Sequence, residues 1–512
     1  MEMCSDFLVV KTESGLIRGE HGGSHDVRVF KGIPYAKAPV GDLRWREPQP
    51  VEPWEGVREA LEYGPDEIQT QCSPEDKDNY IVNNVLSEDC LYLNVWAPAA
   101  VDKMNAYPIA VYVFGGGFQG GSVKDPAISG DVMARKDVIL VTMTYRTGVF
   151  GFMPHPELQK ESKNGTTGNY GLLDIVAAID WIRRNAGVFG GDADNITLFG
   201  QSAGGRAVYD LCSSDILKGK IKHAVILSGG GLSTKSREGS FLPFEEAIHR
   251  GEAWLESIQV KSIKEARALP AWELHEKYKE ARWLFDDRAP FRPVIDGYVL
   301  KEDPNESFKK GNALDIQYMI GCTANECDPP RHPWTEDKEK FMAKIKALYG
   351  EHWSEFWEVA NADNLEDMVK NQKIEFYEKD LAGCFSLCEN QLKLGRKPAY
   401  QYYFTQVPPG SPKGIGAFHS GDLPYVFNTL PVCWRPYTGV DYDISCAMND
   451  YYCNFFRTGD PNGGRLVKWQ PYTRGSEKAM WLQSDFQMKE VPKSNMVEFQ
   501  IDFILERLAG KT

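Results

Sequence analysis

The chain has 512 residues, of which 42% are hydrophobic and 12% aromatic, as in an ordinary globular protein with a large core. Asp and Glu number 72 against 58 Lys and Arg, which gives a net charge of −14, and no basic cluster interrupts this balance. The charge argues against nucleic acid or an anionic membrane as a partner, and no segment is long and apolar enough to span a bilayer.

The first residues and the cysteines bear on the compartment. Residues 1–10 hold no positively charged region and only a short apolar run, so we expect no signal peptide and a cytoplasmic protein. Eleven dispersed cysteines are too few for a disulfide scaffold in a chain of this length. Cys72 and Cys90 could bridge across an acidic loop in an oxidising compartment. No paired C-x-x-C motif supports zinc, and we expect neither a metal nor a cofactor.

The N-terminal part of the chain predicts a succession of short strands. Residues 9–11, 15–18 and 27–32 are strand candidates separated by glycine-rich turns, and residues 91–96 continue this pattern. Residues 108–114 form a near-continuous apolar run, which is typical of a strand covered on both faces.

A glycine-rich loop follows this last strand, and two functions fit it. Gly115, Gly117 and Gly120 spell G-x-G-x-x-G, the pattern of a dinucleotide site. Such a site expects an acidic residue at the end of the next strand, residues 138–144, where the sequence has Tyr-Arg instead. The other interpretation is that the glycines let backbone amides approach a reacting carbonyl oxygen, as in an oxyanion hole.

The middle of the chain alternates helices and strands, which indicates a mostly parallel sheet flanked by helices. Residues 196–199 and 224–227 are short apolar strands. A helix is expected over residues 172–185, with one face assigned to the core: Leu172, Ile175, Val176, Ile179 and Ile182. Helical, tryptophan-containing stretches at about 235–310 and 336–395 predict cap insertions in a single domain of residues 1–512, because no linker or repeat divides the chain.

The turn Gly200-Gln-Ser-Ala-Gly lies between a strand and the helix expected over residues 203–211. A chain that passes from strand to helix in so few residues needs small residues at Gly200 and Gly204, and it leaves Ser202 strained and exposed at the apex. The amide of Ala203 then begins a helix, where unpaired N–H groups favour an incoming negative charge. The turn therefore offers a nucleophile and part of an oxyanion hole.

A serine nucleophile needs a base, and the base needs an orienting acid, here in the chain order serine, acid, histidine. His419 lies in a glycine-rich loop bounded by apolar residues, the setting expected after a late strand. Residues 316–320 read as a strand, and Glu326 follows at its carboxyl end. A solvated loop histidine and a surface glutamate are the alternatives. We expect the other downstream histidines to be exposed: His223, His249, His275, His332 and His352.

The chain resembles the type-B carboxylesterase, or cholinesterase-like, family of α/β-hydrolases over nearly its whole length. The resemblance implies Ser202 as nucleophile, Glu326 as acid and His419 as base, with the amides of Gly116, Gly117 and Ala203 as oxyanion donors. It rests on seven ordered motifs: Phe30-Lys-Gly-Ile-Pro-Tyr-Ala, Ser87-Glu-Asp-Cys-Leu-Tyr-Leu-Asn-Val, Gly115-Gly-Gly-Phe, Tyr145-Arg-Thr-Gly-Val-Phe-Gly-Phe, Gly168-Asn-Tyr-Gly-Leu-Leu-Asp, Phe189-Gly-Gly-Asp and Gly200-Gln-Ser-Ala-Gly-Gly.

The sequence departs from the family pattern at three places. Gln201 stands where a glutamate commonly precedes the nucleophile, which removes a buried charge and changes the setting of the base. Phe114 precedes the glycine triplet in place of histidine or tyrosine, with little loss expected because backbone amides bind the oxyanion. Between Cys72 and Cys90 the only aromatic residue is Tyr80, where cholinesterase-like members carry a tryptophan for a quaternary ammonium group, so choline esters are disfavoured.

We therefore expect a small-molecule ester as substrate, cleaved through an acyl-enzyme on Ser202, with small to medium neutral esters preferred. Acyl transfer to another acceptor, or amide hydrolysis, by the same residues is the alternative. A non-catalytic binding protein on the same fold is disfavoured, because all three catalytic groups are present. No motif fixes the acyl or alcohol preference, the stereoselectivity or the oligomeric state.

Overall fold

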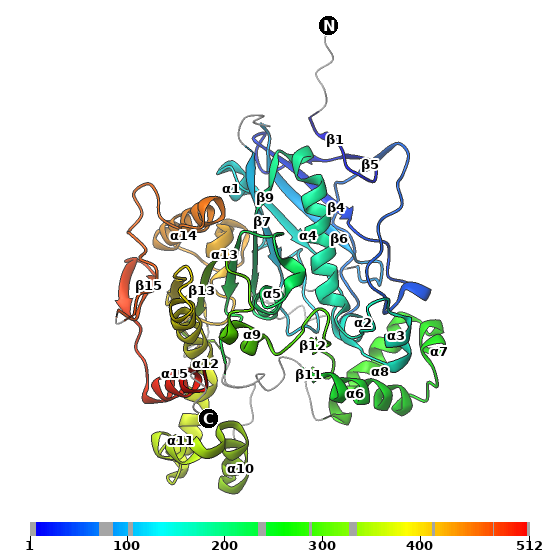
Figure 1. The fold of residues 1–512 in the computed structure, drawn as a ribbon. Helices are drawn as coiled ribbons and strands as arrows, with labels where there is room; N and C mark the ends of the chain where they lie inside the picture. Colours follow the sequence, from blue (N-terminus) through cyan, green and yellow to red (C-terminus); the bar gives the residue numbers. More distant parts are fainter. Residues whose placement is uncertain are drawn as a thin grey trace.

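An 11-stranded sheet runs through the computed structural model, which describes residues 7–70, 85–100, 106–233, 242–285, 289–326, 335–411, 415–474 and 476–508 (Figure 1). The strands lie in the order β16-β15-β14-β13-β10-β9-β7-β8-β6-β4-β3. Their bounds are β3 (Glu20–His21), β4 (Val27–Pro34), β6 (Tyr92–Pro98), β7 (Tyr107–Val113), β8 (Ile139–Met143), β9 (Gly191–Gln201), β10 (His223–Leu227), β13 (Gln317–Thr323), β14 (Tyr400–Phe404), β15 (Lys478–Leu482) and β16 (Gln487–Glu490).

The central strands of this sheet, from β15 through β8, are parallel to their neighbours. Antiparallel pairs occur only toward the two edges of the sheet in the described part of the chain. The mostly parallel sheet predicted from the alternation of elements is thereby confirmed. Because parallel strands end at the same edge, the loops after β7, β9, β13 and β14 meet there, and this edge is where the candidate site lies.

Two smaller sheets accompany the large one. The first joins β1 (Val9–Lys11), β2 (Leu16–Arg18) and β5 (Val57–Glu59) near the N-terminus, and the second joins β11 (Leu242–Pro243) to β12 (Val294–Ile295). The strands predicted over residues 9–11, 15–18 and 27–32 correspond to β1, β2 and β4.

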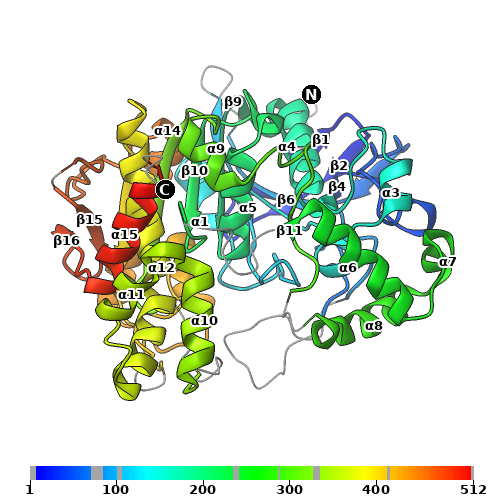
Figure 2. The ribbon, with the colours of Figure 1, turned by 60° about the horizontal axis from the view of Figure 1, so that its bottom comes forward.

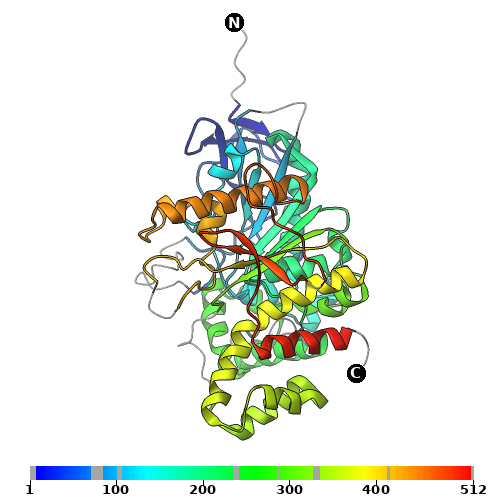
Figure 3. The same cartoon turned by 90° about the vertical axis from the view of Figure 1, so that its left-hand side faces the viewer.

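Helices cover the large sheet on both faces, and Figure 3 shows α14 and α12 on opposite sides of the strands near one edge. Among the described residues, no helix combines the length and the apolarity needed to cross a membrane. The helix bounds are α1 (Asp131–Arg135), α2 (Gly148–Phe152), α3 (Pro156–Glu161), α4 (Tyr170–Phe189), α5 (Ala203–Cys212), α6 (Phe244–Ser257), α7 (Ile263–Ala268), α8 (Ala271–Leu284), α9 (Pro304–Lys310), α10 (Lys338–Tyr349), α11 (Trp353–Val359), α12 (Leu365–Lys393), α13 (Leu423–Phe427), α14 (Gly439–Thr458) and α15 (Asn495–Leu508).

Helix α4 shows how local sequence sets an element. It is longer than the predicted 172–185, because residues up to Phe189 still contribute buried side chains. It ends where Gly190 takes the left-handed conformation with φ 85°, which glycine adopts without the steric cost of a side chain. All five residues assigned to its core face are buried, so that prediction is confirmed.

Two helical groups extend from the sheet, and Figure 2 shows them well apart. Helices α6, α7 and α8 form one group. Helices α10 and α11, with parts of α12 and α15, form the other, around a separate apolar cluster that includes Phe341, Tyr349 and Phe356. The second half of α12 contributes Cys384 and Leu387 to the main core instead. The helical character predicted for both stretches is therefore present among the described residues.

Candidate active site

The turn between β9 and α5 holds Ser202 in a strained backbone conformation. Its φ of 57° and ψ of −124° lie in a region that residues with a side chain rarely adopt. The neighbouring glycines are required by close packing, because a Cβ on Gly200 would lie 2.5 Å from the carbonyl carbon of Gly204. A Cβ on Gly204 would lie 2.1 Å from the carbonyl oxygen of Val113. The strained apex expected from the sequence is present, and Ser202 N–H donates to the carbonyl of Leu227 (2.9 Å).

Three side chains from three separate loops meet at this turn. His419 Nε2 lies 2.8 Å from Ser202 Oγ, and His419 Nδ1 makes a very short contact with a carboxylate oxygen of Glu326. Glu326 comes from the loop after β13, and His419 from the loop between β14 and α13. The structure thus brings together the serine, the acid and the histidine that the sequence singled out.

Glu326 is fixed by further hydrogen bonds. Its side chain is buried at 4% exposure, and its Oε1 accepts the backbone N–H of Thr323 at 2.5 Å. The adjacent Asn325 ties this loop to the histidine loop, because its backbone N–H donates to the carbonyl of Ala417 (3.0 Å) while its Oδ1 accepts the N–H of Ala417 (2.9 Å). No motif in the sequence marks Asn325 for this role.

The charge of Glu326 shifts the pKa of His419 upward. Burial works to lower the pKa of His419, but the negative charge of Glu326 and its hydrogen bond outweigh burial, so the pKa lies above its ordinary value of 6.5. A second carboxyl group lies behind them: Asp422 is fully buried, and burial together with the charge of Glu326 raises its pKa to about 7. Tyr402 Oη lies 3.5 Å from Asp422 Oδ2.

The glycine-rich loop after β7 lies directly beside the serine. A Cβ on Gly115 would lie 2.8 Å from Ser202 Cβ. Gly116 and Gly117 take φ values of 119° and 65° and are exposed, and their backbone N–H groups donate no hydrogen bond within the described residues. Phe114, just before them, stacks on Tyr145 with ring centroids 4.4 Å apart. The loop can therefore offer free backbone N–H groups beside Ser202.

This geometry rules out the dinucleotide interpretation of the same glycines. A dinucleotide site needs a helix that begins at the glycine turn, so that its N-terminus faces the pyrophosphate. In the structure the chain continues from Gly121 without a helix until α1 begins at Asp131.

Gln201 contacts the histidine directly. Its side chain is 3% exposed, and its Nε2 lies 3.3 Å from His419 Nε2. The residue that departs from the family pattern thus lies next to the ring nitrogen that faces Ser202, and it presents an uncharged amide there.

The prediction that the other downstream histidines are exposed is wrong for two of them, His223 and His275. His223 is buried at the start of β10, in the middle of the sheet, and burial lowers its pKa to about 4. His275 is buried on the inner face of α8, with Nε2 3.3 Å from Thr70 Oγ1. The exposure of both rings was predicted from their polar neighbours in the sequence. Their burial depends instead on the position of β10 within the sheet and on the face that α8 turns to the core, and neither can be read from neighbouring residues. The side chain of His249 is 76% exposed, as expected, and that of His352 only 16%.

Three predicted features lie outside the described residues: Cys72 of the possible bridge to Cys90, the aromatic residue Tyr80, and the exposed His332. Cys90 is a buried free thiol. Within the described part of the chain, no three His, Cys, Asp or Glu side chains are grouped so that they could hold a metal ion.

Comparison with known proteins gives a consistent result. The model of the carboxylesterase family matches residues 6–500. Fumonisin B1 esterase from Sphingopyxis macrogoltabida is 32% identical over 488 residues, which cover 92% of this chain and 85% of that protein. Para-nitrobenzyl esterase from Bacillus subtilis (strain 168) is 31% identical over 502 residues, which cover 95% of this chain and 97% of that protein.

Solved structures of esterases superpose on nearly the whole fold. A thermophilic PNB esterase, 28% identical, aligns with a TM-score of 0.83 over 97% of this chain and 100% of that chain. The carboxylesterase EST55 from Geobacillus stearothermophilus, 31% identical, aligns with a TM-score of 0.77 over 96% of this chain and 99% of that chain.

Proposed function

This chain belongs to the carboxylesterase family and is a serine hydrolase of carboxylic ester bonds on the α/β-hydrolase fold, and from that premise we propose that Ser202, His419 and Glu326 carry out the reaction. The observation that supports this assignment most directly is the unbroken line of contacts from Ser202 Oγ to His419 Nε2 at 2.8 Å, and from His419 Nδ1 to Glu326. Each contact joins the atoms that a proton transfer to the histidine requires.

The first half of the reaction forms an acyl-enzyme. His419 Nε2 takes the proton of Ser202 as Oγ attacks the carbonyl carbon of the ester. The negative charge that develops on the carbonyl oxygen is accepted by the amides of Gly116, Gly117 and Ala203. The tetrahedral intermediate then collapses, the alcohol leaves with the proton from the imidazolium, and the acyl group stays on Oγ.

The second half repeats these steps with water. His419 removes a proton from a water molecule, which attacks the acyl carbonyl, and the acid leaves as the proton returns to Ser202. Glu326 keeps Nδ1 protonated throughout, so that Nε2 is free to accept, and its charge stabilises the imidazolium.

The proposed substrates are small to medium neutral esters. A carboxylate beside the histidine would favour a cationic alcohol, and Gln201 offers a neutral amide in that position. The relatives named above are esterases of fumonisin B1 and of para-nitrobenzyl esters, and we propose that this chain acts within the same reaction class, without assigning either compound to it.

The test is a series of p-nitrophenyl esters, from acetate to longer acyl chains, run on the wild type and on Ser202→Ala. We expect the variant to lose about 10⁴-fold or more in kcat, with only residual catalysis left. A loss below about tenfold would contradict the assignment of Ser202. A fluorophosphonate should label the wild type and not the variant. Adding an alcohol or an amine and finding an ester or amide product would favour acyl transfer over hydrolysis.

A further inference from the structure

We propose that Gln69 is a positioning residue of this hydrolase, whose side chain holds the glycine loop so that the amides of Gly116 and Gly117 face the oxyanion. The inference rests on the proposed function, because it takes those amides as oxyanion donors. Gln69 belongs to none of the motifs quoted from the sequence.

The side chain of Gln69 holds one backbone residue with both ends of its amide. Its Nε2 donates to the carbonyl of Gly121 (2.7 Å), and its Oε1 accepts the N–H of Gly121 (2.8 Å). Gln69 is 1% exposed, so water does not compete for these groups. The amide therefore pairs with Gly121 as a peptide group of a neighbouring strand would, although the two residues are 52 positions apart.

Close packing carries this restraint to the catalytic amides. A Cβ on Gly120 would lie 2.2 Å from Gln69 Oε1, and a Cβ on Gly116 would lie 2.0 Å from the carbonyl oxygen of Gly120. Gly116 therefore packs directly against Gly120, and Gly120 packs directly against the side chain of Gln69. The loop also closes on itself, because Gln119 N–H donates to the carbonyl of Gly116 (3.0 Å). A shift of Gly120 would move Gly116 with it.

Other contacts hold different parts of the loop. Gln119 Oε1 accepts the hydroxyl of Tyr278 on α8 (2.5 Å), and Gln119 Nε2 donates to the carbonyl of Phe291 (3.0 Å). Gly148 N–H donates to the carbonyl of Phe118 (2.6 Å). None of these contacts involves Gln69, so we expect them to remain when it is replaced. We therefore expect the loop to stay in place but to lose the alignment of its amides, which predicts a partial loss of activity.

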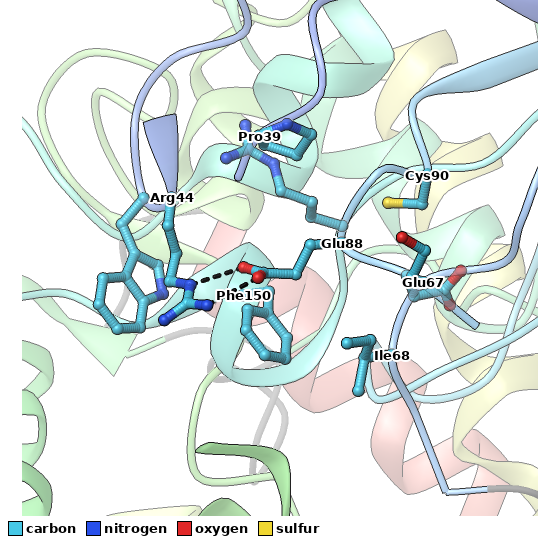
Figure 4. Close-up of a pocket in the computed structure, with 10 residues that line it drawn as sticks. Pro39, Arg44, Glu67, Ile68, Glu88, Cys90 and Phe150 are labelled. Carbon is cyan, nitrogen blue, oxygen red and sulfur yellow. Dashed lines mark hydrogen bonds and ion pairs between the residues drawn. The ribbon is translucent and has the colours of Figure 1, made fainter. Parts of the chain in front are cut away.

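The segment that carries Gln69 is itself well fixed. Asp66 Oδ2 accepts the hydroxyl of Ser122 (3.0 Å), and Glu67 Oε1 accepts the hydroxyl of Thr147 (3.3 Å). Figure 4 shows Glu67 and Ile68 in the wall of a small pocket that Cys90 and Phe150 also line, next to the ion pair between Arg44 and Glu88. Because these hydrogen bonds hold the residues just before Gln69, its side chain can set the position of the loop.

The experiment compares Gln69→Met with Gln372→Met. Methionine has a similar length and no hydrogen-bonding amide. Gln372 is the matched control, because it is 7% exposed and its amide makes the same double contact, with the N–H (3.3 Å) and the carbonyl (2.8 Å) of Thr335. It lies on α12, in the helical group away from the serine. The readouts are kcat and KM for p-nitrophenyl acetate, the affinity for a trifluoromethyl ketone, and Tm.

A trifluoromethyl ketone is the informative ligand because its adduct with the serine places an oxyanion in the same site. We expect Gln69→Met to lower kcat about 10- to 100-fold, less than the 10²- to 10³-fold that loss of one whole oxyanion donor costs. KM should stay within about threefold, and affinity for the ketone should fall by a factor similar to that for kcat/KM. Gln372→Met should leave kcat within about twofold, whatever it does to Tm.

Gln69→Glu keeps the inference testable if the methionine variant does not fold. The ionised carboxylate still accepts from Gly121 N–H but opposes its carbonyl. When protonated, the new carboxyl group can donate to that carbonyl again. The ratio of variant to wild-type kcat should therefore rise as the pH falls.

Three results would overturn the role of Gln69: unchanged kcat and ketone affinity in Gln69→Met, an equal loss in Gln372→Met, or a rise in KM alone. Failure of the proposed function is a separate result. It would show as undiminished activity in Ser202→Ala, whatever the Gln69 variants do.

Discussion

Replacing Glu326 by glutamine tests the proposed acid most sharply, because the two side chains have the same shape. In the wild type, one carboxylate oxygen accepts from Thr323 N–H (2.5 Å) and the other receives Nδ1–H of His419. In Glu326→Gln, the amide oxygen stays on Thr323 N–H, so the NH₂ group faces Nδ1. Nδ1 must then accept, and the ring proton moves to Nε2. The ring can no longer take the proton of Ser202.

The magnitude follows from the same contacts. The opposite amide orientation would set NH₂ against Thr323 N–H in a buried site, and an unsatisfied buried donor costs about 1–3 kcal/mol. The inactive tautomer therefore dominates, and the charge that stabilised the imidazolium is lost as well. Together these effects predict a fall in kcat of about 10³- to 10⁴-fold, comparable to the loss from the equivalent change in serine proteases. This corresponds to about 4–5.5 kcal/mol of activation free energy.

The assay is kcat/KM for p-nitrophenyl acetate as a function of pH. The ring must be neutral to act as base, so wild-type activity should rise with pH through a midpoint above 6.5, the direction in which Glu326 shifts the pKa of His419. In Glu326→Gln the negative charge that opposed the effect of burial is gone, so the pKa of His419 should fall. The acid limb of the residual activity should therefore lie at lower pH than in the wild type.

Glu67→Gln is the matched control for this experiment. Burial raises the pKa of Glu67 well above its usual range and so favours the neutral carboxyl group, and an amide oxygen can accept the hydroxyl of Thr147 as Oε1 does (3.3 Å), so Glu67→Gln should change kcat little. A loss below about tenfold in Glu326→Gln, or an acid limb that does not move, would refute the role of Glu326.

Three further changes test the site and its supports. Gln201→Glu places a negative charge next to His419, which should raise the pKa of the ring. The acid limb of kcat/KM should then move up by about one pH unit. An acid limb that does not move would contradict the contact between residue 201 and His419. Gly200→Ala puts a Cβ 2.5 Å from the backbone of α5. The free energy of unfolding, measured in urea, should fall by about 3 kcal/mol or more. A loss below about 1 kcal/mol would show that the turn relaxes around the new side chain. Arg44→Met removes the buried guanidinium group that donates to the carboxylate of Glu88 at 2.6 and 2.7 Å. The free energy of unfolding in urea should fall by about 3–5 kcal/mol. Unchanged stability would mean that water replaces the lost partner of Glu88.

The regular elements were predictable because buried strands carry their own apolar pattern. Residues 108–114 and 138–144 correspond to β7 (Tyr107–Val113) and β8 (Ile139–Met143) within a residue at each end. The order of strands in the sheet was not predictable, because β9 pairs with β7 and β10 through connections whose path the local pattern does not specify. The buried rings of His223 and His275 were misjudged for the same reason.

Ser202 and Glu326 could be singled out because each stands just after an apolar strand, and His419 because it lies in a glycine-rich loop bounded by apolar residues. Gln69 and Asn325 could not. They act by hydrogen bonds to backbone groups 52 and 92 positions away, and nothing in the residues around them marks a distant partner. Side chains that position a site from afar are thus the part of it that a single sequence leaves unspecified.

A physical rule explains why the positioning residues here are amides. The loops that meet at the serine have no regular secondary structure, so their buried N–H and C=O groups need partners from elsewhere. Asn and Gln carry a donor and an acceptor on one planar group and can satisfy both backbone groups of a residue at once. Gln69 does this for Gly121, and outside these loops Asn169 does the same for Val294 of the two-residue strand β12, with contacts of 2.7 and 2.9 Å. A carboxylate of the same shape lacks the donor and a hydroxyl lacks the reach. At such positions the amide itself, and not polarity or size alone, is therefore what the structure requires.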